Sequence, residues 1–214
     1  MKTETPVILI GAGGHAMVLL DALLLTRAVV LGLVDSDVTL AGRMILGHKV
    51  LGGEDALGAH APGTVRLVNA IGSTASLKRR RSVFERLSAA GHSFASVVHP
   101  SAIVSRYAVA AAGTQVMAGA VIQTSAIIGE NSIINTGARV DHDCRIGAHA
   151  HLAPGVTLSG NVHVGEETHI GAGATVIQGV RIGKRCTIAA GAVVLSEVAD
   201  DMTVAGVPAR RLRE

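Results

Sequence analysis

The second half of the chain repeats an aliphatic position every six residues. From Val104 to Val194, each sixth residue is Val, Ile or Leu, with Ala110 the one exception. Neither the 3.6-residue period of a helix nor the two-residue period of a plain strand explains this spacing. The residue two positions earlier is mostly small, as at Ala126, Ser132, Ala138, Cys144, Ala150, Ala174 and Cys186. Small residues at that position indicate tight corners between short strands.

The sequence also repeats with a period of eighteen residues, which is three times the first period. An aliphatic residue followed by glycine recurs at Ile128-Gly129, Ile146-Gly147, Val164-Gly165 and Ile182-Gly183. Three hexads therefore make one triangular coil of a parallel β-helix, whose coils stack about 4.8 Å apart. Residues eighteen apart should lie one above the other. This predicts that His151 stacks on His169, and that Cys144 and Cys186 lie on different faces without a disulfide.

Residues 1–98 lack the hexad and have an α/β pattern instead. The stretch "VILIGAGGHAMVLLDALLL" predicts a strand, a glycine-rich turn at residues 11–15 and a helix, and "AVVLGLVD" predicts a second strand that ends at Asp35. A third strand with a turn at Gly72, a helix ended by Gly91 and a last strand follow. We expect a small Rossmann-like domain over residues 1–98 and a β-helix domain over residues 99–214.

The glycine-rich turn suggests a nucleotide site. Backbone N–H groups at the start of the following helix could bind a phosphate. A full dinucleotide fold needs two such halves and only one fits before Pro100, so a nucleotide-linked substrate is favoured over NAD(P). The alternative that Gly11 and Gly13 serve only a tight turn remains open.

Composition argues against several classes of partner. The formal charge of +3 comes with one basic cluster, residues 78–81, and the chain has one Tyr, two Phe and no Trp. A basic cluster without aromatic side chains to stack on bases does not favour nucleic-acid binding. The sequence has neither a run of eighteen apolar residues nor a signal peptide. We therefore expect no membrane partner and a cytoplasmic location.

The stretch "RVDHDC" carries the clearest chemistry, because His142 stands between Asp141 and Asp143. A carboxylate that holds one imidazole nitrogen fixes the tautomer and makes the other nitrogen a better base. Zinc is the alternative, since four more histidines follow within thirty residues, but their spacing repeats no ligand pair beyond the stacked two. We expect no metal. His149 and His163 are expected at solvated, outward positions.

The motifs resemble a known family. The hexads "IGENSI", "IGAHAH", "VGEETH" and "IGKRCT", with "VAGVPARRL", resemble the hexapeptide-repeat acyltransferases, which implies a left-handed β-helix. With "GAGGH", "AIGS", "VVHPSA", "HLAPG" and "SGNVHVG" added, the whole chain resembles the N-acetyltransferases of surface-glycan synthesis. These acetylate the 4-amino group of a nucleotide-linked 4-amino-4,6-dideoxy sugar. The resemblance implies acetyl-CoA as co-substrate, no metal, and a homotrimer with active sites between subunits.

The resemblance also implies roles for individual residues. His142 is the catalytic base and Asp143 is its acidic partner. The Gly160 N–H is a donor to the oxyanion of the reaction. The implied nucleotide-sugar contacts are Gly13, Gly14, His15, Asp35, Ser36, Gly72, Ser73 and Asn135. The implied acetyl-CoA contacts are His151, Gly160, Ala172 and Ala190. Where relatives carry Asn and a second acid, this chain has Ser73 and Ser36.

Other functions fit parts of the pattern. A sialic-acid-type O-acetyltransferase is built similarly, and no residue separates an amine acceptor from a hydroxyl acceptor. A non-catalytic scaffold and a zinc-dependent β-helical hydratase are further alternatives, which the Asp-His-Asp cluster and the nucleotide turn disfavour. The overall resemblance leans toward a GDP-linked sugar such as GDP-perosamine over a UDP-linked one.

Overall fold

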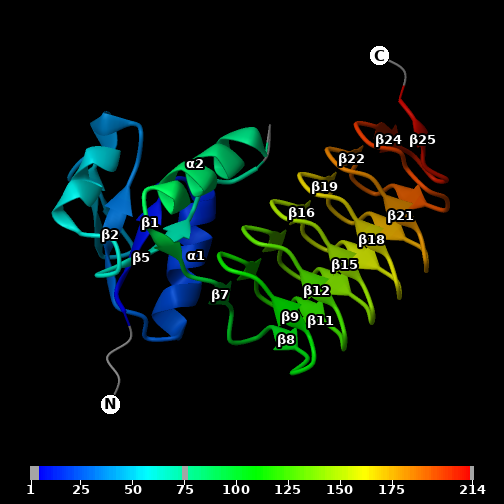
Figure 1. Ribbon diagram of the computed structural model, residues 1–214, viewed down its shortest axis with the longest axis horizontal. Coiled ribbons are helices and arrows are strands. Elements are labelled where there is room, and N and C mark those ends of the chain that lie inside the picture. Colours follow the sequence, from blue (N-terminus) through cyan, green and yellow to red (C-terminus); the bar gives the residue numbers. More distant parts are fainter. Residues whose placement is uncertain (1–4, 74–76, 213–214) are drawn as a thin grey trace. The chain divides into compact units, whose positions relative to one another are not determined.

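The computed structural model describes residues 5–73 and 77–212. The chain forms two compact units, unit 1 (Met1–Pro100) and unit 2 (Ser101–Glu214). Unit 1 contains helices and a sheet, whereas unit 2 is a succession of short strands (Figure 1).

The centre of unit 1 is a six-stranded sheet in the order β3-β4-β2-β1-β5-β6. The strands of the unit are β1 (Val7–Ile10), β2 (Val30–Val34), β3 (Met44–Ile45), β4 (His48–Gly52), β5 (Arg66–Asn69), β6 (Ser93–Phe94) and, outside this sheet, β7 (Val97–Val98). Neighbours run parallel, apart from the antiparallel hairpin β3-β4. β2 and β5 flank β1 on opposite sides, and such a switch in strand order opens a crevice at the carboxyl ends of the strands.

Two α-helices and two 3₁₀-helices complete unit 1. They are α1 (Gly14–Leu25), α2 (Lys78–Ala89), η1 (Val38–Leu40) and η2 (Glu54–Ala59). Phe84 and Leu87 of α2 pack in one buried cluster with Ile8 and Ile10 of β1. Both helices were expected from the sequence. The hairpin and the 3₁₀-helices were not, because residues 36–64 have no regular apolar period.

Unit 2 is a left-handed parallel β-helix, as predicted, with three faces of short strands, which run parallel apart from the last pair of the third face. The first face contains β8 (Ile103–Val104), β11 (Val121–Ile122), β14 (Arg139–Val140), β17 (Thr157–Leu158), β20 (Thr175–Val176) and β23 (Val193–Val194). The second contains β9 (Val109–Ala110), β12 (Ile127–Ile128), β15 (Arg145–Ile146), β18 (His163–Val164) and β21 (Arg181–Ile182). The third contains β10 (Gln115–Val116), β13 (Ile133–Ile134), β16 (His151–Leu152), β19 (His169–Ile170), β22 (Thr187–Ile188), β24 (Thr203–Ala205) and β25 (Arg210–Arg211).

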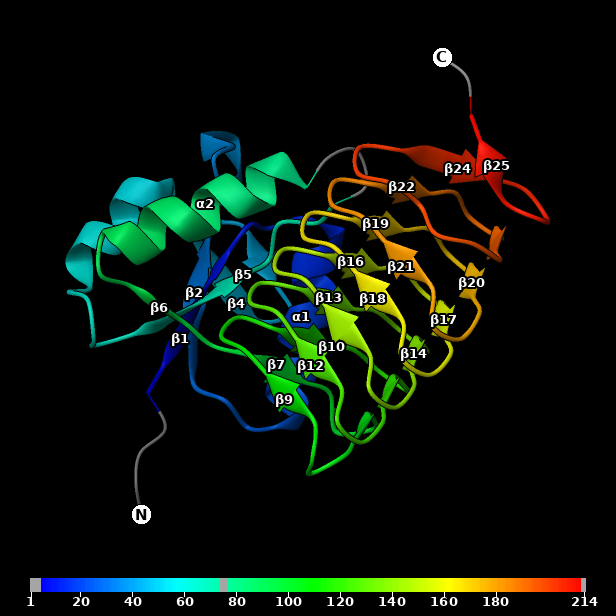
Figure 2. The ribbon, with the colours of Figure 1, turned by 45° about the vertical axis from the view of Figure 1, so that its right-hand side comes forward.

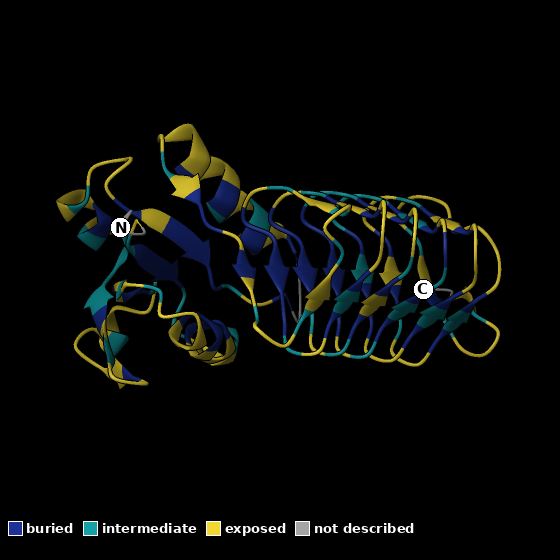
Figure 3. Cartoon of the chain, turned by 90° about the horizontal axis from the view of Figure 1, so that it is seen from below, coloured by how far each residue is buried: buried dark blue, intermediate teal, exposed yellow. Residues whose placement is uncertain are grey.

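From β8 to β23, strands of successive coils pair in parallel with a shift of eighteen residues, for example Val140 with Leu158. Figure 2 shows the coils following one another along the unit. The aliphatic hexad positions from Val116 to Val194 form one buried core, with small residues such as Ala138 and Cys144 at the corners. Figure 3 shows buried residues along the coils of this unit, next to outward-facing residues that are exposed or intermediate. Val104 is 38% exposed because it belongs to the first coil, where the stack begins.

Candidate active site

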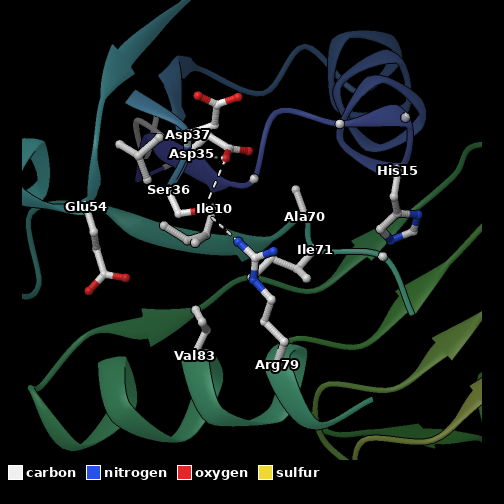
Figure 4. A pocket seen from close by; sticks show the side chains of 15 residues that line it. Ile10, His15, Asp35, Ser36, Asp37, Glu54, Ala70, Ile71, Arg79 and Val83 are labelled. Carbon is white, nitrogen blue, oxygen red and sulfur yellow. Dashed lines mark hydrogen bonds between the residues drawn. The ribbon is translucent and has the colours of Figure 1, made fainter. Parts of the chain in front are cut away.

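Unit 1 contains a cavity of about 520 Å³ at the carboxyl ends of β1, β2 and β5 (Figure 4). Its lining includes six of the predicted substrate residues: Gly13, Gly14, His15, Asp35, Ser36 and Gly72. Ser73 lies next to this lining in the chain and is buried, but it is not one of the residues that line the cavity. The crevice that the strand order creates therefore brings together residues from three separate segments.

The glycine-rich turn has one glycine fixed by packing and two that face open space. Gly11 has a φ of +113°, and a Cβ there would lie 3.0 Å from the carbonyl oxygen of Ala70. Only glycine suits this combination of backbone angle and close approach. A Cβ on Gly13 or Gly14 would meet no atom within 4 Å. The start of α1 therefore borders free volume in which an anion could bind, since a helix N-terminus favours negative charge.

Asp35 holds the turn in place. Its Oδ2 accepts a hydrogen bond from the Ala12 N–H at 2.7 Å, and its Oδ1 accepts one from the Asp37 N–H at 2.9 Å. The carboxylate thus ties the end of β2 to the glycine-rich turn. A ligand in the cavity would meet a carboxylate whose orientation is already fixed.

Arg79 is a functional candidate that the sequence reading missed. Its Nη2 donates to Ser36 Oγ at 2.6 Å, so a cation from α2 faces the segment after β2 across the cavity (Figure 4). In the sequence Arg79 belongs to the basic cluster at residues 78–81, which was weighed only as a nucleic-acid signal. The signal that could have found it is a basic helix start beside a predicted nucleotide turn.

The loop after β5 is held by Arg80, which is fully buried. Its Nη1 donates to the carbonyl oxygens of Asn69 and Ile71 at 2.6 and 2.9 Å, and Asn69 Nδ2 donates to the Arg80 carbonyl at 2.9 Å. Burial lowers the pKa of Arg80 to about 9. These bonds fix the segment that carries Gly72 into the lining of the cavity.

In unit 2, His142 occupies an exposed corner between β14 and β15, and Asp141 and Asp143 flank it. Its Nδ1 lies 2.8 Å from Asp143 Oδ2, and its backbone N–H donates to Asp141 Oδ1 at 2.8 Å. A carboxylate can only accept, so Nδ1 carries the proton and Nε2 of the neutral ring has a free lone pair. The hydrogen bond to Asp143, aided by the charges of Asp141 and Asp143, raises the pKa of His142 above its ordinary value.

Gly160 lies one coil beyond His142 at the same corner. The Asn161 N–H donates to the His142 carbonyl at 2.8 Å, which stacks the two corners directly. A Cβ on Gly160 would lie 2.5 Å from both Cε1 and Nε2 of His142. The structure therefore brings the predicted base and the predicted oxyanion donor together.

Asn135 and His151 form a second pair, on the third face. Asn135 Oδ1 accepts the Thr136 N–H at 2.8 Å, which leaves its Nδ2 to donate to His151 Nε2 at 3.1 Å. His151 is buried and its ring lies 4.9 Å from that of His169, in the predicted stack. The residues expected to contact the sugar and acetyl-CoA are thus neighbours here.

Ala172 and Ala190 lie at a different corner from His142 and Gly160. Both alanines are exposed, and the Gly191 N–H donates to the Ala172 carbonyl at 2.8 Å, so they stack one coil apart. Their corner connects the third face to the first face, whereas the His142 corner connects the first face to the second. The four predicted acetyl-CoA residues therefore do not converge within one chain.

The prediction for His149 was wrong, and His163 is only partly solvated. His149 is 5% exposed, with its Nδ1 2.9 Å from Asn131 Nδ2 in the preceding coil. A φ of +59° at the second corner position accompanies this packing, and Asn131 has the same left-handed conformation. His163 is half-buried and lies 2.9 Å from Arg181 Nη1. Burial, together with the charges of Arg181 and Arg145, lowers its pKa.

Within residues 5–73 and 77–212, no group of three or more His, Cys, Asp or Glu side chains is arranged to hold a metal ion. In the same ranges no helix is long and apolar enough to cross a bilayer. Cys144 and Cys186 are free thiols that precede strands on different faces.

Two family models match the chain. The PglD N-terminal domain matches residues 6–87, and the bacterial transferase hexapeptide (six repeats) matches residues 125–160 and 161–196. No curated protein sequence matches significantly.

Solved structures match over almost the whole length. One is a perosamine N-acetyltransferase from Caulobacter crescentus with one histidine replaced by asparagine, in complex with CoA and GDP-perosamine. It is 40% identical, with 98% of this chain and 97% of that chain covered and a TM-score of 0.91. Another is the acetyltransferase domain of PglB from Neisseria gonorrhoeae, which is 36% identical, with 98% and 100% covered and a TM-score of 0.90. That domain in complex with acetyl coenzyme A is 35% identical, with 97% and 99% covered and a TM-score of 0.89.

Proposed function

The chain belongs to the N-acetyltransferase family that joins a PglD-type N-terminal domain to hexapeptide repeats, and from this premise we propose its reaction. It transfers the acetyl group of acetyl-CoA to the 4-amino group of a nucleotide-linked 4-amino-4,6-dideoxy sugar. The observation that carries the proposal is the 40% identity, over nearly both full chains, with an enzyme bound to CoA and GDP-perosamine. That match favours a GDP-linked substrate over a UDP-linked one.

His142 is the proposed base. The sugar amine attacks the thioester carbonyl, the new C–N bond forms, and the C–S bond then breaks. The amine proton passes to Nε2 of His142 and leaves with the CoA thiolate. Asp143 supports this role because its carboxylate, 2.8 Å from Nδ1, stabilises the imidazolium that forms. The Gly160 N–H is the proposed donor to the oxyanion. Single-histidine variants of the perosamine enzyme exist as solved complexes, which fits a histidine-dependent reaction.

We assign nucleotide-sugar binding to residues 1–98 and acetyl transfer to residues 99–214. The cavity of unit 1 supports the first assignment, because a helix start, the fixed Asp35 carboxylate and the Arg79 cation suit a diphosphate with its ribose and base. Asn135 is the proposed contact to the sugar from unit 2.

Acetyl-CoA is proposed to bind between two chains of a homotrimer. The support is that Gly160 and the pair Ala172 and Ala190 lie at different corners of one β-helix. One chain would provide His142 and Gly160. The neighbouring chain would provide His151, Ala172 and Ala190. A threefold arrangement makes three such clefts equivalent. The enzyme is proposed to work in the cytoplasm, where acetyl-CoA is made.

The test is to incubate the protein with acetyl-CoA and a panel of GDP-, UDP- and dTDP-linked 4-amino sugars, and to follow the release of free thiol. We expect the largest kcat/KM with a GDP-linked 4-amino sugar. Thiol release only with sialic acids or with hydroxyl analogues of the sugars would identify an O-acetyltransferase instead. No release with any acceptor would contradict the proposal.

A further inference from the structure

Gly160 belongs to a row of corner residues that stack along the β-helix. Within the row, Thr124, His142, Gly160 and Gln178 follow one another at intervals of eighteen residues. Backbone bonds join the coils here, because the Asp143 N–H donates to the Thr124 carbonyl and the Gly179 N–H donates to the Gly160 carbonyl at 3.0 Å. Gly160 is the member of the row without a side chain.

The backbone of the corner does not require glycine at this position. Thr124, His142 and Gln178 occupy it in the other coils, and Gly160 is not among the glycines with a positive φ. The next position of the corner is the left-handed one, as Asp143 and Asn161 demonstrate with φ of +60° and +56°. The reason for glycine at 160 therefore lies in what the missing side chain leaves free.

The imidazole of His142 occupies that space. A Cβ on Gly160 would lie 2.5 Å from its Cε1 and Nε2 and 3.2 Å from its Cδ2, and real Cβ atoms essentially never come within 3.0 Å of a heavy atom of a residue that is not their chain neighbour. Two contacts thus set the orientation of the imidazole ring. Asp143 holds Nδ1, and the space beside Gly160 in the next coil accommodates the ring edge that carries Nε2. His142 is about half exposed, so few other contacts hold it in this orientation.

We propose that Gly160 is a positioning residue for the His142 base, through its lack of a side chain. The proposal rests on the proposed acetyl transfer. It is distinct from a role of the Gly160 N–H toward acetyl-CoA, since every residue except proline retains that group. An added methyl would turn the imidazole out of the corner, and the exposed ring can move without unfolding the coil.

The first experiment is Gly160→Ala. We expect kcat to fall by about 10²-fold, the loss that a misplacement near 1 Å can cause, with the Kd of acetyl-CoA and of the nucleotide sugar within about 3-fold of the wild type. The control is Gly58→Ala, which adds the same methyl at a site where a Cβ meets no atom within 4 Å, and its kcat should be unchanged. A Gly160→Ala enzyme with wild-type kcat would overturn the positioning role.

The second experiment separates positioning from direct contact with acetyl-CoA. If Gly160 acts through His142, adding Gly160→Ala to a His142→Ala enzyme should lower the residual rate by less than about 2-fold, because coupled residues are not additive. An equal loss in both backgrounds would overturn the proposal. An NMR titration of His142 provides a readout without turnover: in Gly160→Ala its pKa should fall toward the ordinary value, and an unchanged pKa would count against the displacement.

These outcomes also separate the two proposals. A wild-type protein that releases no thiol contradicts the acetyltransferase function itself. An active wild type with an active Gly160→Ala variant contradicts only the positioning role.

Discussion

The two units bring their candidate residues together in different ways. In unit 1 the contacts join distant segments: Asp35 reaches Ala12 across 23 residues, and Arg79 reaches Ser36 across 43. In unit 2 the contacts follow the coil, since Asp143 is adjacent to His142 and Gly160 lies one coil away. The cavity of unit 1 is therefore a product of sheet topology, whereas the corner of unit 2 is a product of a repeat. A change in unit 1 should weaken binding, and a change at the His142 corner should slow the chemistry.

The largest effect is expected from His142→Asn. An exposed corner side chain contributes little to the core, so the fold and both affinities should persist, while kcat falls by about 10²–10⁴-fold. Steady-state kinetics with calorimetric Kd values would measure this. Near-normal turnover at saturating substrates would contradict His142 as the general base. Oxyanion stabilisation and substrate orientation would then be the sources of catalysis.

A smaller effect, of a different kind, is expected from Asp35→Ala. The variant loses a carboxylate that lines the cavity and that accepts the Ala12 and Asp37 N–H groups. A hydrogen bond from the nucleotide sugar to such a charged group contributes about 1.5–3 kcal/mol, so the Kd of the nucleotide sugar should rise about 10- to 100-fold. Calorimetry should find the Kd of acetyl-CoA nearly unchanged. Asp55→Ala, at an exposed position of η2 outside the cavity lining, is the control. Equal losses for both ligands would contradict the division between the units.

The smallest catalytic effect is expected from His149→Ala, one corner after His142. Its removal leaves the buried Asn131 amide without this partner, so the free energy of unfolding should fall by about 1–3 kcal/mol while kcat stays within about 2-fold. Denaturant unfolding measures the free energy of unfolding, and steady-state kinetics measure kcat. His163→Ala, at a half-buried position, should destabilise less. If His149→Ala kept full stability but lost activity, the proposed contrast between a catalytic His142 and a structural His149 would be contradicted.

The sequence allowed more to be predicted in unit 2 than in unit 1, and the reason is the repeat. The eighteen-residue period was enough to predict the stack of His151 on His169, and the same spacing could have placed His149 on Asn131 had it been applied there. In unit 1 the glycine turn and Asp35 are local signals. The basic start of the second helix could have marked Arg79 as a candidate, but its contact with Ser36 could not be predicted, because that contact depends on how α2 packs on the sheet. The hairpin at residues 44–52 lacks an apolar period of its own.

The most direct test of the account is the pH dependence of kcat/KM in the wild type and in Asp143→Asn, since asparagine tolerates the left-handed φ of +60° at this corner. Only neutral His142 can accept a proton, so the wild-type rate should rise with pH through an ionisation above 6.5, the ordinary pKa, which the Asp143 hydrogen bond raises. In Asp143→Asn that inflection should move to lower pH and the plateau should fall by about 10-fold. Any ionisation of the amine substrate is common to both enzymes and cancels in the comparison. The same inflection in both enzymes, or none between about pH 6 and 8, would contradict a His142 base tuned by Asp143.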